Sequence, residues 1–177
     1  MPSFDPRTLG RLPGGALDAV AYRNQASGFD PQSGDGARRL GGRFNAPHSF
    51  PVLYLCTSRP CVVAELTRQA ERQSLSVGDL LPRELWEITV ALDRLLDLTD
   101  ATTRDALGLA PTDLIRDDRS YTRDIGEAAH EQGFQAIRSP SATGVNDVLA
   151  ILPENLAGAV LNVELVREWR ALDDLVL

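Results

Sequence analysis

The sequence reads Gly41-Gly42-Arg43-Phe44-Asn45 and, shortly afterwards, Val52-Leu53-Tyr54-Leu55. Two glycines allow a turn that side chains would forbid, and they let the backbone approach a ligand closely. An arginine in this turn presents a planar guanidinium group, which can bind a phosphate or a carboxylate through two parallel hydrogen bonds. The turn, the arginine and the apolar strand predict one wall of an anion-binding pocket; the alternative is an ordinary hairpin turn with a solvated arginine.

Strand and helix patterns alternate on both sides of this turn, which predicts an α+β fold. Segment 24–50 is rich in glycine, serine, asparagine, aspartate and proline, so we expect a loop there. No repeat or linker interrupts the chain, and we expect a single domain over residues 1–177. The expected strands are 17–23, 51–56, 86–92, 134–138, 148–152 and about 160–166. The expected helices are one that follows a cap at Thr57 or Ser58 and runs to about Arg72, one at 121–132, and short helices and turns within 100–118.

Composition and charge limit the classes of function. The chain has 177 residues, of which 43% are hydrophobic and 24% charged, as in a globular protein. Its net charge of -7 gives no general attraction to a nucleic-acid backbone, so we expect no direct nucleic-acid binding. All 18 basic residues are arginines. A lysine nucleophile, a lysine Schiff base and a Walker-type phosphate lysine are therefore excluded.

The first residues lack the basic and apolar regions of a signal peptide, and no apolar run is long enough to cross a bilayer. We therefore expect a cytoplasmic protein that makes no membrane contact. Cys56 and Cys61 are too few for a disulfide framework and are expected to be reduced and buried. His48 and His130 stand alone in the sequence, so we expect no metal site.

Two further polar residues stand in unusual surroundings. Glu65 lies in the apolar segment 61–66, either as a functional carboxylate or as a solvated helix residue paired with Arg68. Ser141 follows an expected strand, where a hydroxyl either binds a ligand or caps a turn. A Gly-x-Ser-x-Gly nucleophile elbow is missing around it, which favours a binding role over a nucleophilic one.

The order of these residues resembles the RES domain, a family named for its arginine, glutamate and serine. Arg43, Glu65 and Ser141 follow one another at the family's spacing, and the likeness covers roughly residues 18–170. Many members carry an arginine shortly after the Pro-Ser-Ala segment, where this chain has Thr143 and Gly144. Further matches are Tyr22-Arg23, Tyr54 and Asn146.

The resemblance implies an ADP-ribosyltransferase-like core of small twisted, largely antiparallel sheets flanked by helices. It also implies the toxin of an Xre–RES toxin–antitoxin pair, whose Xre-type antitoxin blocks the active site. The implied substrate is NAD, cleaved between nicotinamide and ribose by water or phosphate, with no other cofactor. The alternatives are a mono-ADP-ribosyltransferase that modifies a protein and a non-catalytic nucleotide-binding partner module.

The same resemblance implies roles for the site residues. Arg43, Glu65 and Ser141 form the implied catalytic set. Glu65 would stabilise the positive charge that develops on the ribose, and Ser141 would bond the nicotinamide amide or position the ribose. Four other residues are implied in substrate binding: Arg23 at the pyrophosphate together with Arg43, Tyr54 and Tyr22 as an aromatic face for nicotinamide, and Asn146 in support of Ser141.

Overall fold

A computed structural model describes residues 4–159 and 161–176, which form a mixed α+β fold as the sequence predicts. The strands are β1 (Gly15–Gln25), β2 (Leu53–Cys56), β3 (Arg83–Asp97), β4 (Ala136–Pro140), β5 (Asp147–Ile151) and β6 (Leu161–Trp169). The α-helices are α1 (Pro6–Gly10), α2 (Asp35–Leu40), α3 (Arg59–Arg72), α4 (Ala101–Leu107) and α5 (Ser120–Glu131). Short 3-10 helices are η1 (Val77–Leu80), η2 (Pro111–Leu114), η3 (Pro153–Asn155) and η4 (Leu172–Leu175). Residue 160, where the last strand was expected to begin, lies outside the described residues.

The six strands belong to one sheet in the order β1-β2-β5-β4-β3-β6, and β1 also pairs with β3. Five strands therefore form a closed ring, and β6 is added to the outer edge of β3. All pairings are antiparallel except that of β3 with β4. The prediction of several small sheets is wrong, because β3 has 15 residues and joins them. It pairs with β1 and β6 along most of its length and with β4 at its end.

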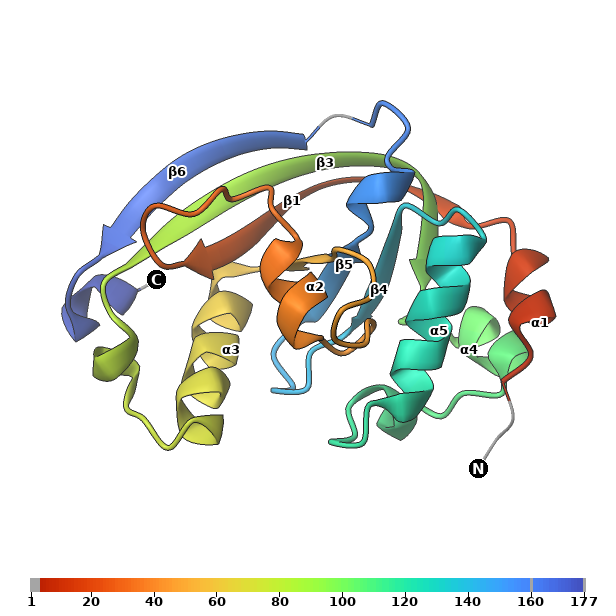
Figure 1. Cartoon of the computed structure of the whole chain (residues 1–177), viewed down its shortest axis with the longest axis horizontal. Helices are drawn as coiled ribbons and strands as arrows, with labels where there is room; N and C mark the ends of the chain where they lie inside the picture. The colour runs from red at the N-terminus through yellow and green to blue at the C-terminus, as the bar shows by residue number, and fades with distance from the viewer. Residues whose placement is uncertain (1–3, 160, 177) are drawn as a thin grey trace.

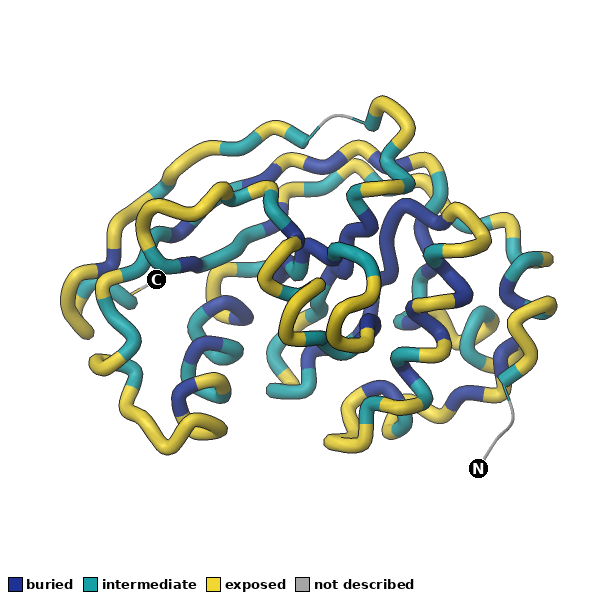
Figure 2. The backbone as a smooth tube through the Cα atoms, in the orientation of Figure 1, coloured by how far each residue is buried: buried dark blue, intermediate teal, exposed yellow. Residues whose placement is uncertain are grey.

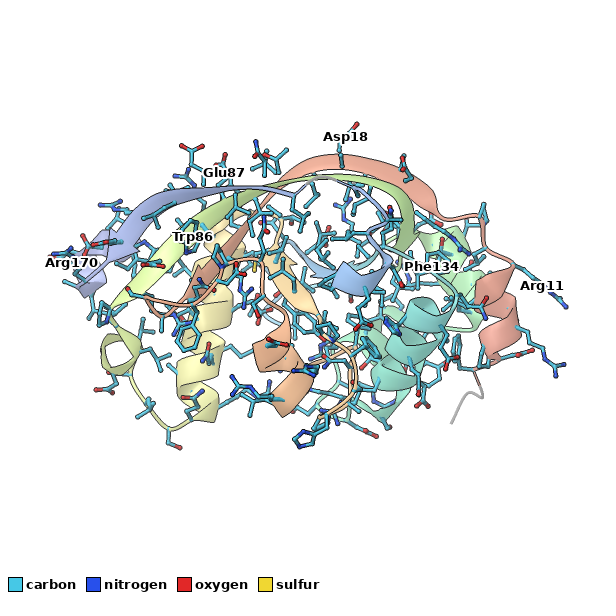
Figure 3. The ribbon with its side chains drawn as sticks, turned by 45° about the horizontal axis from the view of Figure 1, so that its top comes forward. Arg11, Asp18, Trp86, Glu87, Phe134 and Arg170 are labelled. Carbon is cyan, nitrogen blue, oxygen red and sulfur yellow. The ribbon has the colours of Figure 1, made fainter. Side chains whose placement is uncertain are left out.

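Strand β3 shows the expected alternation with one interruption. Ile88, Val90 and Leu92 are buried, and the residues between them are exposed. Alternation along residues 86–92 would place Trp86 on the same buried face, but a bulge against β6 lies between Leu85 and Trp86. Leu85 takes the inward position instead, at 2% exposure. Figure 3 shows Trp86 among the side chains at this end of the sheet.

Helix α3 begins and ends where the sequence predicts. The Ser58 hydroxyl accepts a hydrogen bond from the Cys61 N–H at 3.1 Å, and a proline lies in the first turn. Its buried residues are Cys61, Val62, Leu66 and Ala70, which pack against the sheet. This orientation turns the opposite face, which carries Glu65, away from the core.

Segment 24–50 is not a loop throughout, because helix α2 lies within it. The helix is six residues long and bounded by glycines, and an ion pair of 3.2 Å joins Arg38 to Asp35 inside it. The high glycine and serine content around it concealed so short a helix. The segment lies between α3 and α5, and both helices lie below the arched strands β1, β3 and β6 in Figure 1.

The buried residues are concentrated in the strands and on the inner side of α5 (Figure 2). They form three clusters, and the third and smallest lies between α3 and the ends of β1, β3 and β6. Helix α5 packs in the first cluster and α3 in the third, and the Gly-Gly-Arg-Phe-Asn turn lies in the space between these helices. None of the described helices is apolar and long enough to cross a bilayer.

Candidate active site

A cavity of about 470 Å³ opens beside the Gly-Gly-Arg-Phe-Asn turn. The turn, β1, β2 and α3 supply most of its wall, and a second pocket of about 410 Å³ adjoins it and shares part of the lining. Of the residues that the sequence singles out, five line the first cavity: Tyr22, Arg23, Arg43, Tyr54 and Glu65.

Both glycines of the turn are required by its geometry. Gly41 has a φ of 74°, a conformation that side chains rarely adopt. A Cβ at Gly42 would overlap the phenol of Tyr54. A third glycine, Gly126 of α5, allows the helix to approach so closely that a Cβ there would collide with the Phe44 carbonyl oxygen. The turn is thus pressed between β2 and α5.

Hydrogen bonds hold the turn from both sides. The Tyr54 hydroxyl accepts from the Phe44 N–H at 2.9 Å and donates to the Asn45 side-chain oxygen at 2.9 Å. Burial raises the pKa of Tyr54, so the hydroxyl keeps the proton that it donates. From α5, the Thr122 hydroxyl donates to the Arg43 carbonyl at 2.7 Å. Arg43 therefore extends from a backbone that is fixed on two sides.

The Arg43 side chain lies in a strongly positive environment. One of its Nη atoms donates to the Arg116 carbonyl at 2.9 Å. Burial lowers the pKa of Arg43, Arg119 and Arg68 lower it further, and Glu65 opposes them. An anion in the cavity would relieve this repulsion between guanidinium groups.

Glu65 accepts a hydrogen bond from the Ser141 hydroxyl, which in turn contacts the Thr143 hydroxyl. The Ser141 Oγ donates to the Glu65 Oε1 at 2.6 Å and lies 2.6 Å from the Thr143 Oγ1. Ser141 is 2% exposed and is absent from the described lining, whereas Glu65 and Ala142 are part of it. The Thr143 N–H also donates to the Ser141 Oγ at 3.1 Å, so Thr143 contacts Ser141 through both its backbone and its hydroxyl. The structure therefore joins Ser141 to the site through Glu65.

Tyr22 and Arg23 of β1 also line the cavity. One Nη of Arg23 donates to the carbonyls of Pro31 and Ser33 at 3.1 and 2.9 Å. Burial lowers the pKa of Arg23, and nearby Arg83 lowers it further. Arg23 thus fixes the loop after β1 and also lines the cavity.

Asn146 lies apart from the cavity lining. It is exposed, with a φ of 51°, and its Oδ1 accepts from the Ser58 hydroxyl at 2.6 Å. Its carbonyl accepts from the Ser141 N–H at 3.0 Å. Asn146 therefore connects the start of α3 to the loop that holds Ser141.

Four arginines of the cavity were missed by the sequence analysis: Arg68, Arg72, Arg83 and Arg119. The sequence could have predicted two of them, because Arg68 and Arg72 lie three and seven positions after Glu65 and therefore on the same face of the helix. Arg68 does not turn to Glu65 as the pairing alternative expects. Its guanidinium donates to the Ala142 carbonyl at 3.1 Å and to Asp117 at 3.2 Å.

Comparisons with known proteins identify the family. The RES domain family model matches residues 19–174. This chain belongs to the RES domain family. The proteins named NAD(+) phosphorylase MbcT from Mycobacterium tuberculosis and Mycobacterium bovis are 37% identical to this RES domain over 132 residues, which cover 73% of the chain and 71% of each relative.

A solved structure shows the same fold. The crystal structure of the Mycobacterium tuberculosis MbcT–MbcA toxin–antitoxin complex matches this RES domain with a TM-score of 0.79 and 29% identity. The match covers 93% of this chain and 91% of the other. The likeness thus extends over nearly the whole of both chains.

The charge of the cavity sets it apart from the rest of this RES domain. Six arginines line it, and Glu65 is the one carboxylate among the described lining residues, although the whole chain carries a charge of -7. Such a site attracts a ligand with several negative charges. No group of three or more described His, Cys, Asp or Glu side chains could hold a metal ion.

Proposed function

We propose that this RES domain cleaves NAD at the bond between nicotinamide and ribose, with phosphate as the acceptor. One observation carries the proposal: a carboxylate fixed by a buried serine stands in a cavity lined by six arginines. NAD pairs a cationic nicotinamide ribose with an anionic pyrophosphate, and the site offers the matching charges. The relatives named NAD(+) phosphorylase support the choice of reaction.

Two arginines of the first cavity can bind the pyrophosphate. Arg43 and Arg23 both line the cavity, and both are partly desolvated. Charge-assisted hydrogen bonds from guanidinium to phosphate are stronger in such a setting than in water. We assign the pyrophosphate to these two residues.

Glu65 is assigned to the ribose. When the glycosidic bond breaks, its electron pair passes to the pyridine nitrogen, nicotinamide leaves as a neutral molecule, and positive charge develops on the ribose. A carboxylate beside the ribose stabilises that charge in the transition state more than in the ground state. The neutral leaving group needs no general acid, which agrees with a site built from arginines and one carboxylate.

The remaining predicted residues receive supporting roles in the proposal. Ser141 is a positioning residue, since its hydroxyl orients Glu65 from the buried side. Asn146 supports the same loop through Ser58 and the Ser141 N–H. Tyr22 and Tyr54 line the cavity and offer ring surface to the nicotinamide.

We also propose that the fold is a single ADP-ribosyltransferase-like domain and that the protein is a toxin neutralised by an Xre-type antitoxin over the cleft. The largely antiparallel sheet flanked by helices supports the first part. The matched toxin–antitoxin crystal structure supports the second. Leu40, 82% exposed, precedes Gly41 at the second pocket and gives a partner an apolar contact beside the opening.

The test is incubation of the purified protein with NAD, with and without phosphate, followed by identification of the products. We expect nicotinamide and ADP-ribose 1-phosphate in phosphate buffer. Glu65→Gln is expected to lower the rate at least a hundredfold, while Glu71→Gln, an exposed carboxylate on the same helix, is expected to keep it. Intact NAD in every condition would refute the proposal, and label transferred to a protein would indicate ADP-ribosylation instead.

A further inference from the structure

The cavity holds more positive charge than the pyrophosphate of NAD requires. Two linked phosphates carry two negative charges, whereas six arginines face one carboxylate. Guanidinium groups gathered around one cavity repel one another, so such an excess points to a second anionic ligand.

The arginines divide into two groups by position. Arg23, Arg43 and Arg83 line the first cavity alone. Arg68, Arg72 and Arg119 line both the first cavity and the adjoining pocket, and Glu65 lines both as well. We call Arg68, Arg72 and Arg119 the outer arginines. They share the lining of both pockets with Glu65, and Arg68 and Arg72 lie on the same helix as Glu65.

The outer arginines are close together and largely unengaged. Burial lowers the pKa of Arg119, and Arg72 is the neighbouring charge that lowers it most. Within residues 4–159 and 161–176, no side-chain hydrogen bond or ion pair engages Arg72 or Arg119. Arg68 contacts Asp117, whose side chain is 89% exposed, and such a surface pair is readily exchanged for a stronger anion.

We infer that the outer arginines bind the inorganic phosphate that attacks the ribose, an inference that rests on the proposed function. Glu65 and phosphate are both negative, and three guanidinium groups between the two pockets offset their repulsion. Phosphate oxygen forms the new bond to C1 of the ribose, the glycosidic electron pair passes to the pyridine nitrogen, and the phosphate proton is released to solvent. Arg72 is exposed, so this end of the site receives phosphate from solution.

Phosphate and NAD are thereby bound by different arginines, so steady-state kinetics can distinguish their sites. In Arg72→Gln and Arg119→Gln, we expect the KM for phosphate to rise tenfold or more and the KM for NAD to change less than threefold. Arg11→Gln is the matched control, because Arg11 is exposed at the end of α1 and points away from the molecule (Figure 3). An unchanged KM for phosphate, or a parallel rise of both KM values, would overturn the inference.

A second measurement does not depend on catalysis. Calorimetric titration of the NAD-free protein with inorganic phosphate is expected to show binding to the wild type and to Arg11→Gln, with at least tenfold weaker binding to Arg72→Gln and Arg119→Gln. Equal phosphate affinity in all four proteins would refute the site. If the wild type leaves NAD intact but binds phosphate through these arginines, the proposed reaction fails and the phosphate site stands.

Discussion

Replacement of Tyr54 by phenylalanine separates two roles that this residue can have. The ring lines the cavity, whereas the hydroxyl bonds the Phe44 N–H and the Asn45 side chain, each at 2.9 Å. Phenylalanine keeps the ring and removes the hydroxyl. Any loss of stability or activity in Tyr54→Phe therefore measures how far the hydroxyl's hydrogen bonds fix the Gly-Gly-Arg-Phe-Asn turn.

The size of the loss follows from the groups left without a partner. Phe44 and Asn45 are both fully buried, and an unsatisfied buried polar group costs about 1–3 kcal/mol. Two such groups lower the free energy of unfolding by about 3 kcal/mol. In a domain of this size we expect a fall in Tm of about 6–12 °C. Displacement of Arg43 with the turn is expected to lower kcat/KM by about tenfold to a hundredfold.

Calorimetry and nicotinamide release measure the two effects. Tyr121→Phe is the matched control, because its hydroxyl is buried and has no partner among the described residues. That change is expected to leave Tm the same or raise it slightly. A Tyr54→Phe protein with unchanged Tm and full activity would refute the role of the hydroxyl and would leave only the ring.

Two further predictions follow from the same contacts. Ser141→Ala removes the 2.6 Å hydrogen bond to Glu65, worth about 1.5–3 kcal/mol for a charged acceptor, and should lower kcat/KM by about 10- to 150-fold with NAD affinity nearly unchanged. Gly126→Ala places a methyl group against the Phe44 carbonyl and should cost about 3 kcal/mol or more of unfolding free energy, measured by chemical denaturation.

Each has an outcome that would contradict it. Full activity of Ser141→Ala would show that Glu65 is positioned without the serine. For Gly126, the control is Gly36→Ala in α2, where a Cβ meets nothing within 4 Å and should stabilise the helix by about 0.5–1 kcal/mol. Equal stability of the Gly126→Ala and Gly36→Ala variants would contradict the close packing of α5 against the turn.

Local signals in the sequence were sufficient for the elements that carry Glu65 and Arg43. The Ser58 cap and the apolar spacing predict α3 from its first turn to Arg72, and the turn glycines predict where the backbone bends. These features depend on residues a few positions apart. The short helix α2 and the bulge beside Trp86 were not predictable in this way, because bounding glycines hide the first and pairing with β6 causes the second.

The sequence by itself determined the residue types of this protein's site: an arginine on a glycine turn, a glutamate on an amphipathic helix and a serine after a strand, in the order of the RES family. Only the tertiary structure decided how they act together. Strand pairing brings Ser141 to Glu65 and places Arg83 of β3 in the cavity, and Arg119 joins them from the start of α5. Contacts between residues so far apart depend on chain pairing and burial, which no local spacing encodes.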